Sequence, residues 1–175
     1  MKRLIGCLSG MMILFAITSC IDNKRARNFN NMVDDSAVVF IKQGLEAGQT
    51  EIMASKIAET TSKNTRIVNF AHMMIADHAT FNDDLQKIAI DDKIAASDSV
   101  SDAHQAAITS MTNNSGVKFD QAYLQLMIAG HQDAIKIFNI AKSDRNEAVQ
   151  KFARKTLPVL MMHLDSANAI AASLK

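Results

Sequence analysis

The sequence predicts an all-α fold, and three features of its composition and pattern indicate it. The chain has 175 residues, of which 48% are hydrophobic and 21% are charged, and this suits one globular domain. It contains one proline and six glycines, which is few for a β-rich fold with many turns. Four long stretches carry apolar residues at alternating steps of three and four, the spacing of an amphipathic helix.

The charge balance gives no sign of a nucleic-acid partner. The formal net charge is +1, and aromatic residues make up 5% of the chain. Domains that bind nucleic acids usually carry a basic patch or stripe, and this sequence has none. It also lacks a glycine-rich phosphate loop, a Cys-x-x-Cys pair and a serine in the setting of a nucleophile. The common phosphate-binding, thiol-redox and serine-hydrolase motifs are therefore excluded.

Residues 1–19 have the layout of a lipoprotein signal peptide. A short basic start, Met1-Lys2-Arg3, precedes an uncharged apolar stretch that is too short to span a bilayer comfortably. It ends in Ile17-Thr-Ser-Cys20, which resembles the bacterial lipobox, where the cysteine becomes the lipidated first residue. We expect lipidation at Cys20 and a lipid-anchored protein of the cell envelope, in the outer membrane facing the periplasm. A plain secretory signal and an uncleaved anchor are the alternatives.

The cysteine count agrees with this interpretation. Cys7 lies within the predicted signal, so Cys20 would be the one cysteine left after cleavage and no disulfide framework is expected. Residues 20–33 are polar and rich in asparagine, and we expect them to form a flexible tether between the lipid and the domain. The membrane, reached through the lipidated cysteine, is the one partner that the sequence predicts.

Residues 34–175 are predicted to form a four-helix bundle. Its helices are expected at about residues 34–61, 64–91, 117–141 and 144–173. Short polar turns within the first and the second pair predict two antiparallel hairpins. The connection 92–116 is long enough to cross the full height of a bundle, with a short helix from Ser101 to about Met111. Two hairpins joined by one long crossover form the ferritin-like type of bundle, and an up-down-up-down bundle with a long loop is the alternative.

Each predicted helix carries one ionisable residue on its inward face, near its middle. These residues are Glu51, His78, His131 and His163. Facing helices of a bundle can bring such side chains together, and imidazole with a carboxylate suits Zn, Cu, Fe, Mn or Ni. The pattern therefore predicts a transition-metal site. Two alternatives stay open: a buried polar network that sets helix register without a ligand, and four separate residues, because their counted heights differ by one to two turns.

Other polar residues near these positions are expected to lie outside the cluster. Asp77, Asp133 and Asp165 are adjacent to the three histidines or two residues away, and they point to other helix faces. We expect them to be outer partners of the histidines or surface groups. His72 and His104 are expected at the surface.

Methionines near the histidines suggest a second possibility for the metal. Met74 and Met127 each precede an inward histidine by four residues, and Met162 precedes His163 directly. Thioether and imidazole together would suit copper. Methionine also fills gaps in apolar cores, and this is the simpler interpretation of the pattern.

A set of short motifs, in order along the chain, resembles one family. The family comprises exported bacterial proteins that carry the domain of unknown function DUF 4142, grouped with ferritin-like bundles. The matching pieces span about residues 34–173 and are Gly48-Gln-Thr-Glu51, Phe70 to His78, Gly116 to Asp120, Ala122-Tyr123-Leu124, His131-Gln132, Leu157-Pro158 and His163-Leu164. The resemblance implies a ferritin-like fold in the cell envelope. It implies no established activity.

The candidate ligands depart from the pattern of di-iron enzymes. Those enzymes need a glutamate three residues before the histidine on two helices, and Ile75 and Leu160 stand at these positions here. Position 131 is histidine where a glutamate would be expected, so Glu51 alone matches a carboxylate ligand. This argues against ferroxidase or oxygen-activating chemistry. A hydrolase or oxidase would also need an open coordination position and a substrate pocket, and the sequence reveals neither. The alternative to a metal-binding protein is a structural or stress-related envelope protein without catalysis.

Overall fold

The computed structural model describes residues 35–97 and 99–174. The described residues form five helices and no strand, which confirms the all-α prediction. The helices are α2 (Asp35–Thr61), α3 (Thr65–Asp91), α4 (Asp102–Thr112), α5 (Val117–Ala141) and α6 (Glu147–Ala171). The predicted signal peptide, Cys20 and the predicted tether all lie outside the described residues. Within the described ranges, no helix is long and apolar enough to cross a membrane.

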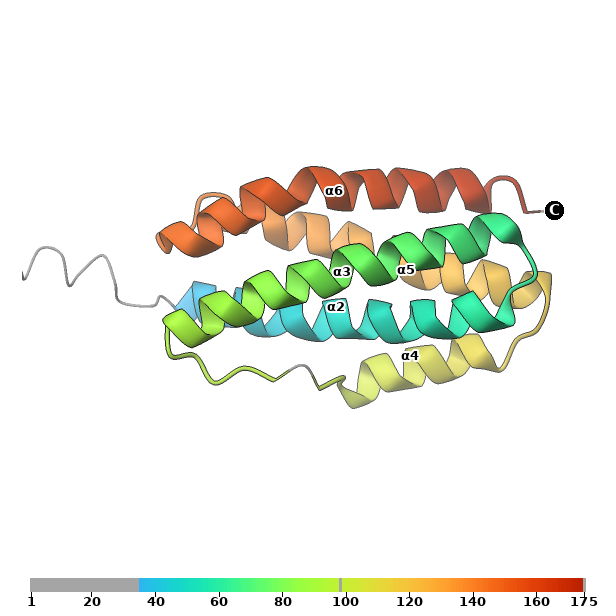
Figure 1. Ribbon diagram of the computed structural model, residues 1–175, viewed down its shortest axis with the longest axis horizontal. Coiled ribbons are helices and arrows are strands. Elements are labelled where there is room, and N and C mark those ends of the chain that lie inside the picture. The colour runs from blue at the N-terminus through green and yellow to red at the C-terminus, as the bar shows by residue number, and fades with distance from the viewer. Residues whose placement is uncertain (1–34, 98, 175) are drawn as a thin grey trace, which may run out of the picture.

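The four long helices are arranged as two antiparallel hairpins (Figure 1). The first hairpin is α2 with α3 and the second is α5 with α6; α2 also packs on α5, and α3 on α6. The segment 92–116 returns along the bundle, so α3 and α5 run in the same direction (Figure 1). Helix α4 lies on this return and contacts α2 and α5. The long crossover is therefore confirmed, and the up-down-up-down alternative is wrong.

Side-chain caps fix where several helices begin. The Asn64 side chain accepts a hydrogen bond from a backbone N–H in the first turn of α3, and Ser101 does the same for α4. Asn146 accepts two such bonds, from Ala148 and Val149, so α6 begins at Glu147, three residues after the predicted start. Gly116 precedes α5 with a φ of +55°, a conformation that glycine adopts without strain.

The core consists of two apolar clusters separated by a polar layer. The cluster nearer the turn that joins α2 and α3 includes Phe70, Met74, Tyr123 and Met127. The other cluster lies toward the opposite end of the bundle and includes Phe40, Leu85, Phe138, Phe152 and Leu160. Along each long helix, the inward polar residue lies between the positions that join the first cluster and those that join the second. The bundle therefore places its four inward polar residues in one layer.

Two details distinguish the last two helices. Val117 is apolar but 47% exposed, because it is the first residue of α5 and lies at the end of the bundle. Helix α6 runs from Glu147 to Ala171 with Pro158 inside it. The first turn of α6 extends beyond the end of α5 (Figure 1). His163 lies farther from the turn between α5 and α6 than His131 does, so this offset helps to bring the two histidines to the same height in the bundle.

Candidate metal centre

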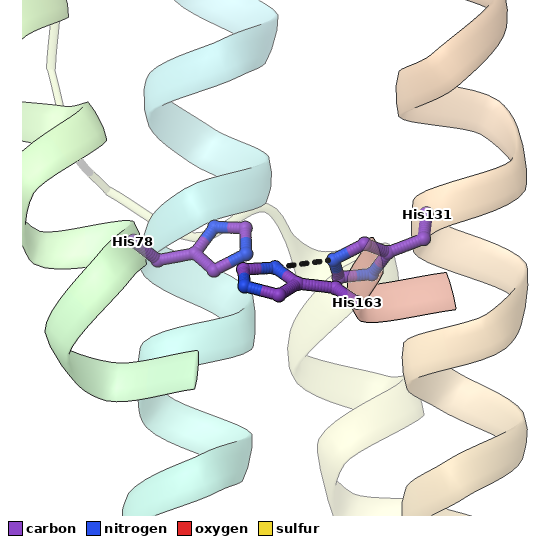
Figure 2. Close-up of side chains that lie close together, drawn as sticks. All are labelled: His78, His131 and His163. Carbon is purple, nitrogen blue, oxygen red and sulfur yellow. Dashed lines mark hydrogen bonds between the residues drawn. The ribbon is translucent and has the colours of Figure 1, made fainter. Parts of the chain in front are cut away.

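The structure brings all four predicted site residues together. Glu51, His78, His131 and His163 are 7%, 5%, 1% and 0% exposed, so the polar layer is shielded from solvent. The three imidazole rings come from α3, α5 and α6 and point toward one another (Figure 2). Their centroids are 5.4–5.5 Å apart in every pair. The alternative of separate, individually satisfied residues is therefore wrong.

The three histidines have the spacing of a site that could hold a metal ion. Within the described part of the chain, one nitrogen from each ring lies within 4.8 Å of the other two. Metal–nitrogen bonds of about 2.0–2.1 Å put two ligand nitrogens about 3.3–3.4 Å apart in a tetrahedral site. His131 Nε2 and His163 Nδ1 are already 3.3 Å apart. His78 would be the third ligand of a three-histidine set, and its nitrogen would have to come closer than the present limit of 4.8 Å.

Each of these two rings has its other nitrogen bound to an oxygen. His131 Nδ1 lies 2.9 Å from the Met127 carbonyl oxygen and 3.1 Å from Glu51 Oε1. His163 Nε2 lies 2.9 Å from Asp77 Oδ2. Histidines that bind metals usually donate their second N–H to a carboxylate or carbonyl, which orients the ring and fixes its tautomer. Both rings are therefore held with one nitrogen directed inward.

These contacts determine where protons must lie. His131 Nδ1 and His163 Nε2 both face oxygen acceptors, so each must carry a proton. If both rings were neutral, their inward nitrogens would have no proton, and two lone pairs would face each other at 3.3 Å. The His131–His163 contact therefore needs one additional proton, or a cation in its place.

The electrostatics assign that proton to His131. Burial alone would lower the pKa of His131, but the Glu51 carboxylate and the Met127 carbonyl outweigh it and raise the pKa. For His163, burial lowers the pKa, and its hydrogen bond to Asp77 offsets this only in part. The imidazolium therefore forms next to Glu51.

His78 differs from the other two histidines. Its Nε2 lies 3.2 Å from Glu51 Oε2, but the direction is unsuitable for a hydrogen bond, and the buried nitrogen has no hydrogen-bond partner. Burial lowers the pKa of His78 to about 4, although Glu51 acts in the opposite direction. Burial would raise the pKa of Glu51, but attraction to His78 and His131 outweighs it and lowers the pKa. A neutral imidazole thus presents an unsatisfied atom beside an ionised carboxylate.

Glycines make room for this layer. A Cβ atom on Gly130 would lie 2.7 Å from Glu51 Oε1, so only glycine allows the carboxylate to pack against the backbone of α5. Gly44 and Gly48 of α2 allow close contact with Leu85 and Asn82 of α3. Sequence reasoning missed Gly130, although it directly precedes His131.

Asp77 is the second residue whose role the sequence did not specify. The adjacent residue on α3, His78, points into the cluster, whereas Asp77 reaches α6 and accepts from His163. Its side chain is 37% exposed, so the acceptor lies at the edge of the buried layer. Asp133 is exposed and pairs with Lys136. The expectation that the neighbouring aspartates are outer partners or surface groups fits both residues.

The other histidines and the methionines lie away from the cluster. His72 is exposed and pairs with Glu59 at 2.9 Å. His104 is partly exposed and pairs with Glu46 at 2.9 Å. Met162 is 46% exposed, whereas Met74 and Met127 lie in the apolar cluster next to the histidines. The packing thus fits the gap-filling interpretation of the methionines.

A cavity of about 280 Å³ reaches the polar layer from one side. Glu51 and His78 line it, together with aromatic and small residues of α2, α3, α5 and α6. No pattern in the sequence indicates this pocket, because its walls come from positions far apart along the chain. The cluster is therefore not sealed on the side of Glu51 and His78.

Comparison with known proteins identifies one family. A family model described as "Domain of unknown function (DUF4142)" matches residues 22–170, which include every long helix almost to its end. No curated protein and no solved structure matches the chain. The family resemblance seen in the sequence is confirmed, and the ferritin-like relationship stays a prediction.

Proposed function

The chain belongs to the DUF4142 family, and we propose that it binds one transition-metal ion in the middle of its bundle. His78, His131 and His163 are the proposed ligands, and Glu51 is the carboxylate that orients His131 and balances the charge. The observation that carries the proposal is the pair of inward nitrogens on His131 and His163. These two nitrogens are 3.3 Å apart, and each ring donates its other N–H to an oxygen.

The residues present fit a divalent ion. Three imidazoles suit Zn, Cu, Fe and Ni, and Mn more weakly, because imidazole is a ligand of intermediate softness. Glu51 and Asp77 together offer two negative charges next to the rings, which offset the charge of a divalent ion. Three histidine ligands would leave a bound ion able to take a further ligand, and the cavity lined by Glu51 and His78 reaches the same layer. A single-ion site fits this set better than a di-iron site, since Ile75 and Leu160 offer no carboxylate.

The competing proposal is a structural envelope protein whose Glu51–histidine network sets helix register. The observation in its favour is that Glu51 and Asp77 already pair with the histidines. The two proposals differ in what a metal does to stability. An ion at 100 times its Kd adds about 2.7 kcal/mol to the free energy of unfolding, which is roughly 5–11 °C in Tm for a domain of this size.

The test is a melting series on metal-free protein with Zn, Cu, Fe, Mn and Ni, followed by measurement of bound metal. We expect a rise in Tm and one ion per chain for at least one metal. The variant His163→Ala should lose both effects. The exposed His72→Ala variant should keep them, because His72 pairs only with Glu59. An unchanged Tm with all five metals would overturn metal binding and support the network.

We also propose that the domain is held in the cell envelope by a lipid on Cys20. The support is the order of a basic start, an uncharged apolar stretch and the Ile17-Thr-Ser-Cys20 motif. Expression with a labelled fatty acid tests it. The label should appear on the wild-type chain and in the membrane fraction, and Cys20→Ala should abolish both. A labelled Cys20→Ala chain would contradict the assignment.

A further inference from the structure

The cavity beside the cluster has an aromatic wall and a polar inner end. Four phenylalanines line it, with Leu85 and Leu160: Phe40, Phe81, Phe138 and Phe152. Their rings contact one another, with centroids 4.9 Å apart for Phe40 and Phe138 and 5.8 Å apart for Phe138 and Phe152. Mutual edge and tilted packing holds such rings in place. The wall is therefore preformed.

The entrance lies between α2 and α5, where the side chains are small. Gly44, Ala47 and Gly48 line it from α2, and Gly130 and Ala134 line it from α5. Gln43 and Asp133, which also line the cavity, are exposed and mark its outer rim. Small residues on both facing helices leave an opening that larger side chains would close.

The charge of the lining is one-sided. Glu46, Glu51 and Asp133 are acidic, and no lysine or arginine is among the lining residues, although His104 also lines the cavity and pairs with Glu46 at 2.9 Å. A carboxylate or phosphate group that entered would meet the Glu51 carboxylate at the inner end, with no lysine or arginine there to pair with. A neutral or cationic molecule meets no such penalty.

The inner end offers an acceptor and an unsatisfied nitrogen. Glu51 Oε2 faces the cavity side of the layer with His78 Nε2, and that buried nitrogen has no hydrogen-bond partner. A hydroxyl or amino group placed there would donate to the carboxylate and hydrogen-bond to the imidazole. This would satisfy a buried nitrogen that otherwise has no hydrogen-bond partner.

We propose that this pocket binds a small aromatic molecule whose hydroxyl or amino group enters first and meets Glu51 and His78. The volume of about 280 Å³ suits one ring with a short substituent, since a cavity of about 150 Å³ holds benzene. Apolar walls recognise the ring, and the two buried polar residues recognise the head group. The proposal goes beyond metal binding and does not require it.

The test uses four probes of similar size with the full chain: phenol, benzylamine, toluene and benzoate. Titrations followed by amide chemical shifts, first with a chelator and then with zinc, give a Kd for each probe. We expect saturable 1:1 binding of phenol and benzylamine with the chelator present. Toluene and benzoate should bind at least tenfold more weakly. Equal binding of toluene or benzoate would overturn the head-group assignment.

Matched variants locate the site. Ala134→Leu should fill the cavity and abolish phenol binding, whereas Ala129→Leu, on the exposed face of the same helix, should bind as the wild type does. Ala47→Leu closes the cavity from α2 and provides a second test if Ala134→Leu does not fold, which circular dichroism reports. Phenol binding that survives both lining variants would overturn the location. A chain that binds phenol but no metal would support the pocket and overturn the metal proposal.

Discussion

Metal binding should displace one proton from the cluster, and the structure gives the count. In the metal-free chain, His131 Nδ1 and His163 Nε2 both donate to oxygens, so the 3.3 Å contact between the inward nitrogens must hold one further proton. A metal ion takes the place of that proton and leaves the two outer N–H groups unchanged. The expected release is therefore close to one proton per ion, and not one per histidine.

The pH dependence follows from the direction of the pKa shift. The pKa of His131 is raised above 6.5 by Glu51 and the Met127 carbonyl despite burial, so at pH 6.5 the protonated form of the cluster is the major one. As the pH rises through this raised pKa the proton is lost, and the release on metal binding falls toward zero. Below it, the apparent affinity should fall about tenfold per pH unit, because metal and proton compete for one position.

Calorimetric zinc titrations in two buffers of different ionisation enthalpy measure this release. The decisive variant is Asp77→Ala. Without Asp77, His163 Nε2 need not donate, so neutral His163 can donate from Nδ1 to His131, and no extra proton is required. The release at pH 6.5 should fall toward zero in Asp77→Ala and stay near one in the exposed control Asp165→Ala. A release near three, or no difference between the two variants, would refute this proton assignment.

Three further predictions concern the same layer. In Gly130→Ala the new Cβ would lie 2.7 Å from Glu51 Oε1, so the carboxylate must move. We expect the zinc affinity, measured by calorimetry, to fall about tenfold or more, because Glu51 orients His131. Metal-free protein should lose stability as the pH falls from 6.5 toward 4, because the pKa of His78 is about 4 in the folded chain and 6.5 in the unfolded chain. The loss in free energy of unfolding is at most about 3 kcal/mol. In His78→Leu, urea unfolding should show a smaller change of this free energy with pH. The same pH dependence in the variant and the wild type would contradict a buried neutral ring. Tyr123→Phe removes the 2.8 Å hydrogen bond to buried Ser55 and should cost about 1–3 kcal/mol in the same assay without changing zinc affinity.

The sequence was sufficient for the fold because helix period and turn length are local signals. Steps of three and four residues fix the inward face of each helix, and a connection of the length of 92–116 can only be a crossover or a long loop. The same face assignment found Glu51, His78, His131 and His163, since a polar residue on an apolar stripe stands out.

The rest of the site depends on distances between helices, which a residue count does not give. Counting from the turns placed the four residues one to two helical turns apart, yet the structure places them in one layer. The heights are set by where α6 starts after Asn146 and by how the helices pack side by side. Asp77 became a partner of His163 only because α3 packs on α6. Gly130 mattered only because Glu51 approaches α5 at that point.

The unsatisfied nitrogen of His78 decides between a layer built for register and a layer built to bind. A polar network kept for register is favourable only when every buried member has its partners, since a half-satisfied network is less stable than apolar packing. Glu51, His131 and His163 meet that condition, and His78 Nε2 does not. The unpartnered nitrogen lies where the 280 Å³ cavity reaches the layer. A ligand arriving there, whether an ion at the three rings or the head group of a small aromatic molecule, would satisfy the atom that this polar layer leaves without a partner.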